Sequence, residues 1–235
     1  MVYNGMVSLL ERKNRQMKTV LFDLDGTLLD TERIYQKYWQ IAAKEAGYDI
    51  APETFLEFRS MASAFAREKM KGIVGNDTAY DEIRNLRKKY MNEEMAQRDI
   101  PLKKGAKEAL ALLRENGFHL AVVTATAEKQ AEEYIARAGL SGALDKLISA
   151  HMVKNGKPAP DVYLFACETL GVAPNSAFAV EDAPNGVISA SDAGCRVIMV
   201  PDLSEPDDAL RTRLAFCAED LMAAAQYILG NHTLF

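Results

Sequence analysis

The amino-acid sequence predicts an α/β protein whose core is a doubly wound parallel β-sheet, with an all-helical segment inserted into it. Downstream of residue 98, short apolar runs alternate regularly with stretches of helical periodicity. The apolar runs are nearly continuous, as expected of parallel strands that are buried on both faces. Residues 31–103 interrupt this alternation with helical stretches only, which indicates an insertion into the α/β pattern.

The strands and helices of the predicted core follow in order along the chain. Strands are expected at 19–22, 119–125, 146–150, 177–182 and 195–200, each bounded by turn residues. Helices are expected between them at 103–117, 127–140, 161–171 and 185–194, several of which end at a glycine.

The inserted segment contains three helical stretches, at 31–47, 52–70 and 78–97. A crossover between parallel strands needs only about a dozen residues, so most of the segment is surplus to the sheet. We therefore expect a catalytic core of residues 17–30 and 104–235, a helical cap of residues 31–103, and an N-terminal extension of residues 1–16. A cap that leaves the sheet after its first strand would cover the crevice at the carboxyl ends of the strands.

Composition excludes several classes of protein. The chain has 235 residues, of which 49% are hydrophobic and 26% charged, with a net charge of −5. This charge provides no broad basic surface, so we expect neither a nucleic-acid nor a membrane partner. Three widely spaced cysteines indicate neither a disulfide framework nor a zinc site. No apolar run approaches a membrane span, and the first residues do not resemble a secretory signal. A cytoplasmic monomer is the expectation.

Two carboxylates follow the first predicted strand. Asp23 terminates this strand at the mouth of the expected crevice, and Asp25 lies two residues further on. If the backbone stays extended, both side chains point the same way, giving one group that can attack or bind a metal and one that can transfer a proton. Gly26 allows a sharp turn, and Thr27 adds a hydroxyl donor. The alternative is an ordinary Asp-Gly turn with solvated acids.

Other polar residues are expected at the same edge of the sheet. Thr124 ends the second strand, where its hydroxyl and the amide of Ala125 can donate to an anion. Lys157 directly precedes Pro158, and Pro158 and Pro160 stiffen its surroundings, although most lysines in such loops are solvent-exposed. Glu181 and Asp182 end a strongly apolar strand and would lie beside the first strand if the two are neighbours.

These groups together favour a magnesium site. Several carboxylates at close range repel one another unless a cation neutralises them. An all-oxygen set of ligands without Cys or His points to Mg²⁺ rather than zinc or copper. The cation, a lysine and a hydroxyl would then bind a dianion with several oxygens, such as phosphate.

Four motifs in order, "DLDGT", "VVTAT", "GKPAPD" and "VEDAPNG", resemble those of the haloacid dehalogenase superfamily of phosphotransferases. The resemblance extends from residue 19 to about residue 200. The insertion after the first motif is similar to the helical cap of the subgroup that contains phosphoglycolate phosphatase-like and β-phosphoglucomutase-like enzymes.

The resemblance implies roles for the residues of the first motif. Asp23 would attack phosphorus and become an aspartyl-phosphate, while Asp25 would protonate the leaving alcohol and then activate water. Mg²⁺ would be held by Asp23, the backbone carbonyl of Asp25 and Asp182, with Glu181 acting through a water.

The remaining motifs have implied roles as well. Thr124 and Lys157 would hold the phosphoryl oxygens, and Asn185 would help to orient the last motif. The implied substrate is a small phosphorylated molecule, and positioned charges would stabilise the transferring phosphoryl group.

Three functions remain open at this point. The leading hypothesis is a phosphatase acting on a small phosphomonoester such as a sugar or polyol phosphate. A β-phosphoglucomutase-type enzyme is the alternative, although the first cap helix lacks the histidine and the 57–65 segment lacks the glycine typical of mutases. A third hypothesis is a signalling receiver domain, which shares an acceptor Asp, a Thr and a Lys, but which is smaller and has no helical insertion.

The cap residues expected to face the substrate are Arg59, Ser60 and Ser63. For Arg59 the alternative is a surface charge on an amphipathic helix. Met61, Phe65 and Met70 recur at helical spacing and are expected to pack in the cap. His151 is interpreted as a loop residue.

Overall fold

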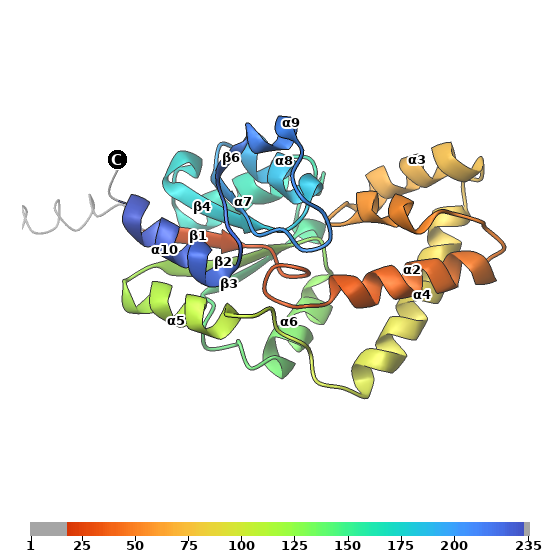
Figure 1. Cartoon of the computed structure of the whole chain (residues 1–235), viewed down its shortest axis with the longest axis horizontal. Helices are drawn as coiled ribbons and strands as arrows, with labels where there is room; N and C mark the ends of the chain where they lie inside the picture. Colours follow the sequence, from red (N-terminus) through yellow and green to blue (C-terminus); the bar gives the residue numbers. More distant parts are fainter. Residues whose placement is uncertain (1–17, 233–235) are drawn as a thin grey trace, which may run out of the picture.

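The structure is a computed structural model that describes residues 18–232 (Figure 1). Its core is a six-stranded parallel sheet with the order β3-β2-β1-β4-β5-β6. The expected N-terminal extension, residues 1–16, lies outside the described residues, as do the last three residues. The predicted fold class is confirmed.

The strands of the sheet are β1 (Thr19–Phe22), β2 (His119–Thr124), β3 (Lys146–Ser149), β4 (Ala177–Glu181), β5 (Arg196–Met199) and β6 (Leu214–Cys217). The helices that flank it are α5 (Ala106–Glu115), α6 (Glu128–Arg137), α7 (Asp161–Leu170), α8 (Pro184–Asp192), α9 (Asp208–Arg211) and α10 (Leu221–Asn231). Short 3₁₀ turns are η2 (Ala150–Met152) and η3 (Pro174–Ser176). Strand β6 and helices α9 and α10 were not predicted from the sequence.

Strand β1 shows why the sheet is covered on both faces. Val20 and Phe22 pack into one hydrophobic cluster with α5, α6 and α10, whereas Leu21 packs into the other with α7 and α8. Successive side chains of a strand point to opposite faces, so an uninterrupted apolar strand buries both. All four residues of β1 are buried.

The inserted segment has its own hydrophobic cluster. Its elements are α2 (Glu32–Glu45), η1 (Pro52–Phe58), α3 (Ser63–Val74) and α4 (Ala79–Ala96). At its centre the Trp39 ring stacks on Phe55, with centroids 5.5 Å apart, and Met70 and Ile83 are fully buried. Figure 1 shows these helices gathered on one side of the sheet. We call residues 31–103 the helical insert.

The expected helix over 52–70 is instead divided in two. After η1 the chain runs through Arg59–Ala62, where Ser60 has a positive φ of 55°, before α3 begins at Ser63. A positive φ cannot be accommodated within a right-handed helix. Phe65 is 39% exposed rather than packed, whereas Met70 is buried as predicted.

Two antiparallel segments connect the insert with the core. The amide of Asp30 donates to the carbonyl of Pro101 at 2.9 Å, and the amide of Lys103 donates to the carbonyl of Leu28 at 3.0 Å. The ammonium of Lys103 lies 2.8 Å from Asp202 Oδ1, which follows β5. The insert therefore leaves and rejoins the core at one place, shortly after the carboxyl end of β1.

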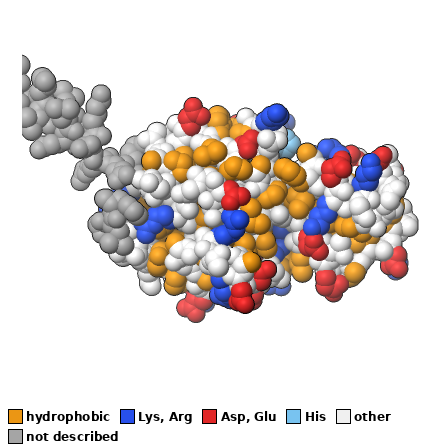
Figure 2. Space-filling view, turned by 90° about the horizontal axis from the view of Figure 1, so that it is seen from above, with side chains coloured by type: hydrophobic (Ala, Val, Ile, Leu, Met, Phe, Trp, Pro, Cys, Tyr) orange, Lys and Arg blue, Asp and Glu red, His pale blue; other side chains and the backbone are white. Residues whose placement is uncertain are grey.

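Charges of both signs are interspersed over the face seen in the space-filling view (Figure 2). Within residues 18–232, no helix is both long enough and apolar enough to span a membrane.

Candidate active site

The sheet topology brings three polar strand ends together. Strand β1 lies between β2 and β4, and Phe22 is in register with both Val122 and Val180. The residues that follow these positions therefore emerge side by side at the carboxyl edge. They are Asp23 after β1, Thr124 at the end of β2, and Glu181 and Asp182 at the end of β4.

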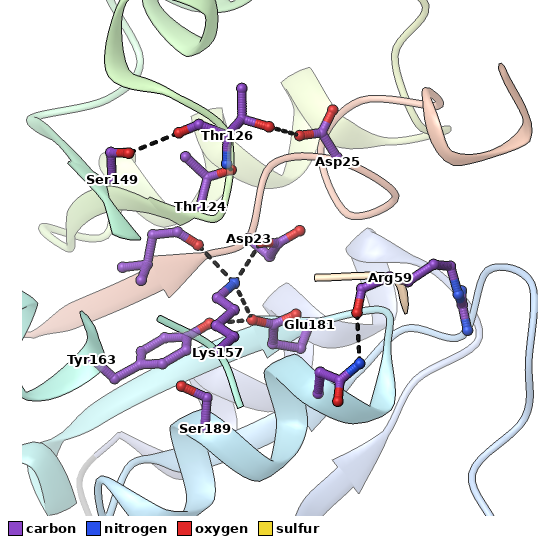
Figure 3. Close-up of polar contacts among 12 residues, drawn as sticks. Asp23, Asp25, Arg59, Thr124, Thr126, Ser149, Lys157, Tyr163, Glu181 and Ser189 are labelled. Carbon is purple, nitrogen blue, oxygen red and sulfur yellow. Dashed lines mark hydrogen bonds and ion pairs between the residues drawn. The ribbon is translucent and has the colours of Figure 1, made fainter. Parts of the chain in front are cut away.

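Lys157 connects two of these acids. Its ammonium donates to Asp23 Oδ1 at 2.5 Å, to Glu181 Oε1 at 2.6 Å and to the carbonyl of Val123 at 2.9 Å (Figure 3). All three N–H groups are used, which is why a lysine can be fully buried here. Burial by itself would lower the pKa of Lys157, but Asp23 and Glu181 outweigh it and raise that pKa.

Three carboxylate oxygens of this group are buried without a hydrogen-bond partner. They are Asp23 Oδ2, Glu181 Oε2 and Asp182 Oδ1. One oxygen from each of the same three residues can be chosen so that all lie within 4.8 Å of one another. A buried polar atom without a partner is costly, and a hard divalent cation satisfies several such oxygens at once. The residues present therefore fit a Mg²⁺ ion.

The pKa values of the acids reflect the same crowding. Burial raises the pKa of Asp23 to about 8, with Lys157 opposing the shift. Burial and the neighbouring Glu32 carboxylate raise the pKa of Asp182 well above its usual range. Glu32, at the start of α2, is 6% exposed, and burial raises its pKa to about 8. A cation bound nearby would lower the pKa values of these three carboxyl groups and so stabilise their ionised forms.

Asp25 is held by two threonine hydroxyls. Thr31 donates to its Oδ1 at 2.7 Å and Thr126 to its Oδ2 at 2.6 Å. Burial raises the pKa of Asp25, while the hydrogen bonds from Thr126 and Thr31 oppose this. Thr31 lies at the beginning of the insert and Thr126 in the loop after β2. The carboxyl group of Asp25 is therefore held from both the insert and the core.

The sharp turn after Asp25 depends on Gly26. Its φ is +87°, and a Cβ added there would lie 2.4 Å from Asp182 Oδ2. Only glycine combines that backbone conformation with so close an approach to a carboxylate. The Thr27 hydroxyl, which was expected to act as a donor, is buried without a partner among the described residues.

The predicted phosphate-binding residues lie at the same edge. Thr124 Oγ1 accepts from the amide of Thr126 at 3.0 Å, and both Thr124 and Ala125 line the cavity described below. Contact between Lys157 and a phosphoryl oxygen remains a prediction. Because all three N–H groups of Lys157 already donate, this contact requires one of those hydrogen bonds to be replaced by one to the phosphoryl oxygen.

The insert contacts the site through residues 57–62. Arg59 is only 3% exposed, and its Nη1 lies 3.3 Å from Asp182 Oδ2, while its Nη2 contacts Ser204. The surface alternative for Arg59 is therefore wrong. Asn185 Nδ2 donates to the carbonyls of Glu57 and Arg59 at 3.0 and 2.8 Å, so it joins the insert to α8. Nearby, the amide of Ala62 donates to the carbonyl of Lys157 at 2.8 Å.

A cavity of about 360 Å³ lies between the sheet edge and the insert. Asp23, Asp25 and Thr124 line its core side. Arg59, Ser60 and Ser63, the three cap residues expected to face a substrate, also line it. His151, from η2, lies at the same cavity.

Several residues of the site were not identified from sequence. Thr31 and Thr126 hold Asp25, and Tyr163 on α7 donates to Glu181. Glu32 was also missed, although it lies in the same segment as the first motif. Thr126 lies within the second motif and Thr31 shortly after the first, and this proximity was the available signal for the two hydroxyls. Tyr163 offered none, because tyrosine within an apolar helix is usually core.

The comparisons with known proteins agree with this geometry. The family profile of haloacid dehalogenase-like hydrolases matches residues 20–200. Hexitol phosphatase A of Escherichia coli is 37% identical over 198 residues, covering 81% of this chain and 88% of the relative. The phosphorylated carbohydrates phosphatase of Thermotoga maritima is 32% identical over 180 residues, covering 76% and 82%.

A solved structure of β-phosphoglucomutase from Clostridium difficile superposes with a TM-score of 0.75 at 18% identity, covering 92% of this chain and 97% of the other. This likeness supports the fold. Taken with the profile match over most of the chain, the convergence of the four motifs at one sheet edge has a direct explanation: the chain belongs to the haloacid dehalogenase-like hydrolases.

Proposed function

We propose that this chain is a phosphatase that hydrolyses a small phosphorylated sugar or polyol through an aspartyl-phosphate on Asp23, with Mg²⁺ as its cofactor. The observation that carries the proposal is the group of three unpartnered carboxylate oxygens beside the Lys157 ammonium. The names of the two relatives above, a hexitol phosphatase and a phosphorylated carbohydrates phosphatase, support the substrate class.

Asp23, Glu181 and Asp182 would hold the cation, together with the backbone carbonyl of Asp25. When bound, Mg²⁺ supplies positive charge that offsets the charge of the phosphoryl oxygens and of the surrounding carboxylates.

In the first step, Asp23 forms a bond to phosphorus as the bond from phosphorus to the leaving oxygen breaks. Lys157, hydrogen-bonded to Asp23, favours the ionised form of the attacking carboxylate and orients it. The hydroxyl of Thr124 and the amide of Ala125 stabilise the phosphoryl oxygens. Asp25 donates its proton to the leaving alcohol, which departs neutral.

In the second step, Asp25 accepts a proton from water as the water oxygen attacks phosphorus. The bond between phosphorus and Asp23 breaks, inorganic phosphate leaves, and both carboxyl groups return to their starting states. Thr31 and Thr126 keep the Asp25 carboxyl group in place through both proton transfers.

The helical insert acts as the cap in this proposal. Its 57–62 segment covers the sheet edge through Arg59 and through the amide of Ala62, which limits access of bulk water to the aspartyl-phosphate.

The mutase alternative is less well supported. The α2 residues that line the cavity are Glu32, Tyr35 and Trp39, so α2 contributes no histidine to it. The receiver alternative does not agree with membership in a family of hydrolases.

The test is phosphate release from a panel of sugar, polyol and nucleotide monophosphates, with and without Mg²⁺. Glucose 1-phosphate isomerisation with a bisphosphate primer is assayed alongside. We expect multiple turnover of sugar or polyol phosphates that EDTA removes and Mg²⁺ restores. Isomerisation that outpaces phosphate release, or turnover that persists in EDTA, would contradict the proposal.

A further inference from the structure

The wall of the cavity formed by α4 carries two arginines that form no ion pair with the residues that the structure describes. Arg84 and Arg87 both line the cavity, one helical turn apart. No carboxylate within residues 18–232 lies at ion-pair distance from either of them. Each of the remaining arginines in that range contacts a carboxylate or a backbone carbonyl.

Arg87 is held in place by aromatic rings rather than by an acid. Its guanidinium carbon lies 4.3 Å from the Trp39 ring centroid and 4.8 Å from that of Tyr35. Its Nε is buried and has no hydrogen-bond partner. The rings restrict the guanidinium, as in a cation–π contact, but they accept none of its N–H groups in the plane.

The arrangement is unfavourable as it stands. Burial lowers the pKa of Arg87, and the like charge of Arg84 acts in the same direction, whereas Tyr35, Tyr80 and Glu32 oppose the shift. Neutral hydroxyls of a ligand could accept hydrogen bonds, but they would add no negative charge beside the two guanidinium groups. A carboxylate or a phosphate would both accept hydrogen bonds and supply negative charge, and the guanidinium group of arginine is well suited to bind either anion.

The position of the arginines relates them to the substrate. The cavity is lined by Asp23 and Thr124 at the sheet edge and by Arg84 and Arg87 on α4, and Trp39 and Phe58 line it as well. A molecule that places its phosphoryl group at Asp23 therefore shares one cavity with the two arginines.

We infer that Arg84 and Arg87 form a second anion subsite, so that the preferred substrate is a phosphorylated sugar derivative with a carboxylate or a second phosphate at its far end. The inference rests on the proposed function, which places the transferred phosphoryl group at Asp23. It narrows the substrate class from neutral sugar phosphates to those with two anionic ends.

The test uses ligands that differ only at the far end. Gluconate 6-phosphate and sorbitol 6-phosphate are both acyclic and differ only in a carboxylate replacing a hydroxymethyl group. Fructose 1,6-bisphosphate compared with fructose 6-phosphate provides the phosphate arm. In at least one pair, we expect kcat/KM to be about tenfold or more higher for the ligand with an anionic group at each end than for the ligand with a neutral far end. Charge-assisted hydrogen bonds provide an effect of this size. The arm with the larger ratio identifies the second anion.

Two variants connect the preference to the arginines. Arg84→Gln, at a partly exposed position, should reduce the ratio towards one, and Arg87→Lys should reduce it partially because the charge is kept without the planar fork. Lys89→Gln is the matched control, since Lys89 is exposed on α4 and does not line the cavity. Its ratio should equal that of the unmodified protein.

Binding without turnover separates this inference from the proposed function. Titration calorimetry of the Asp23→Asn variant in Mg²⁺ should show the same ligand preference. Equal affinities in both pairs, or an unchanged ratio in Arg84→Gln, would overturn the subsite even if the protein is an active phosphatase. Preferential binding by a protein that hydrolyses nothing would support the subsite and refute the proposed function.

Discussion

The hydroxyl of Thr126 donates a 2.6 Å hydrogen bond to Oδ2 of Asp25, across 101 positions of sequence. Thr31 donates to Oδ1, so each of the two carboxylate oxygens accepts a hydrogen bond from a threonine hydroxyl. Such positioning decides how well a general acid reaches the leaving oxygen, because proton transfer depends on alignment.

Replacing Thr126 with Val should lower kcat by about ten- to a hundredfold, since the side chain keeps its shape but loses the hydroxyl that orients Asp25. Thr126→Ser restores a hydroxyl and should recover most of the rate. The measurement is steady-state hydrolysis of p-nitrophenyl phosphate. A Val variant as fast as the Ser variant would show that this hydrogen bond does not position Asp25.

Lys157→Met should destabilise the metal-free protein by about 3 to 5 kcal/mol, because it leaves Asp23 and Glu181 buried without their common cation. Lys154→Met, at an exposed position in the same loop, is the control. Urea unfolding in EDTA measures both variants. If Lys157→Met unfolds at the same urea concentration as Lys154→Met, the buried ammonium is not what stabilises the two acids.

Gly186→Ala should weaken Mg²⁺ binding by about ten- to a hundredfold, a size typical of changes next to metal ligands. A Cβ at Gly186 would lie 2.0 Å from Glu181 Oε2, so the carboxylate must move. Gly142→Ala, where no atom lies within 4 Å of the added carbon, is the matched control. Calorimetric titration with Mg²⁺ gives the affinity, and equal values for the two variants would exclude Glu181 from the metal site.

Glu94 should make the helical insert sensitive to acid. It accepts hydrogen bonds from Lys37, Tyr38 and Arg98, and those from Lys37 and Tyr38 in particular lower its pKa from 4.5 to about 2. A depressed pKa in the folded state contributes stability that is present above pH 4.5 and is lost as the pH falls towards 2.

Glu94→Gln should therefore reduce stability at pH 7 by about 1 kcal/mol or less, as is usual for partly exposed ion pairs. The difference from the unmodified protein should shrink as the pH falls from 4.5 towards 2. Glu93→Gln, an exposed neighbour, controls for the loss of one negative charge. Thermal unfolding across this pH range measures the effect, and a difference that stays constant with pH would rule out the assigned ionisation.

The sequence was sufficient to predict the sheet and the acids at its edge. Asp23, Glu181 and Asp182 each follow a continuous apolar strand, and the carboxyl ends of parallel strands converge at one edge. Lys157 could be included because of the motif around it, although spacing alone does not explain its burial.

Contacts between distant, ordinary residues could not be predicted in this way. Thr126, Tyr163 and Arg87 belong to residue types that are common on loops and helices, and their partners lie on other elements. The break at Ser60 was also missed, because helical periodicity continues on either side of it while its positive φ leaves no compositional signal. Strand β6 was also missed, although Leu214–Cys217 is an apolar run like the other strands; it lies at the edge of the sheet and is only partly buried.

Phosphoryl transfer to Asp23 can be observed by rapid acid quench of a reaction with p-nitrophenyl phosphate and Mg²⁺, followed by mass spectrometry of the digested protein. We predict a phosphoryl group on the peptide that contains Asp23, and neither adduct nor turnover in a folded Asp23→Asn variant. Substantial turnover by that variant, or a phosphoryl group on a different residue, would contradict the role of Asp23 as the nucleophile.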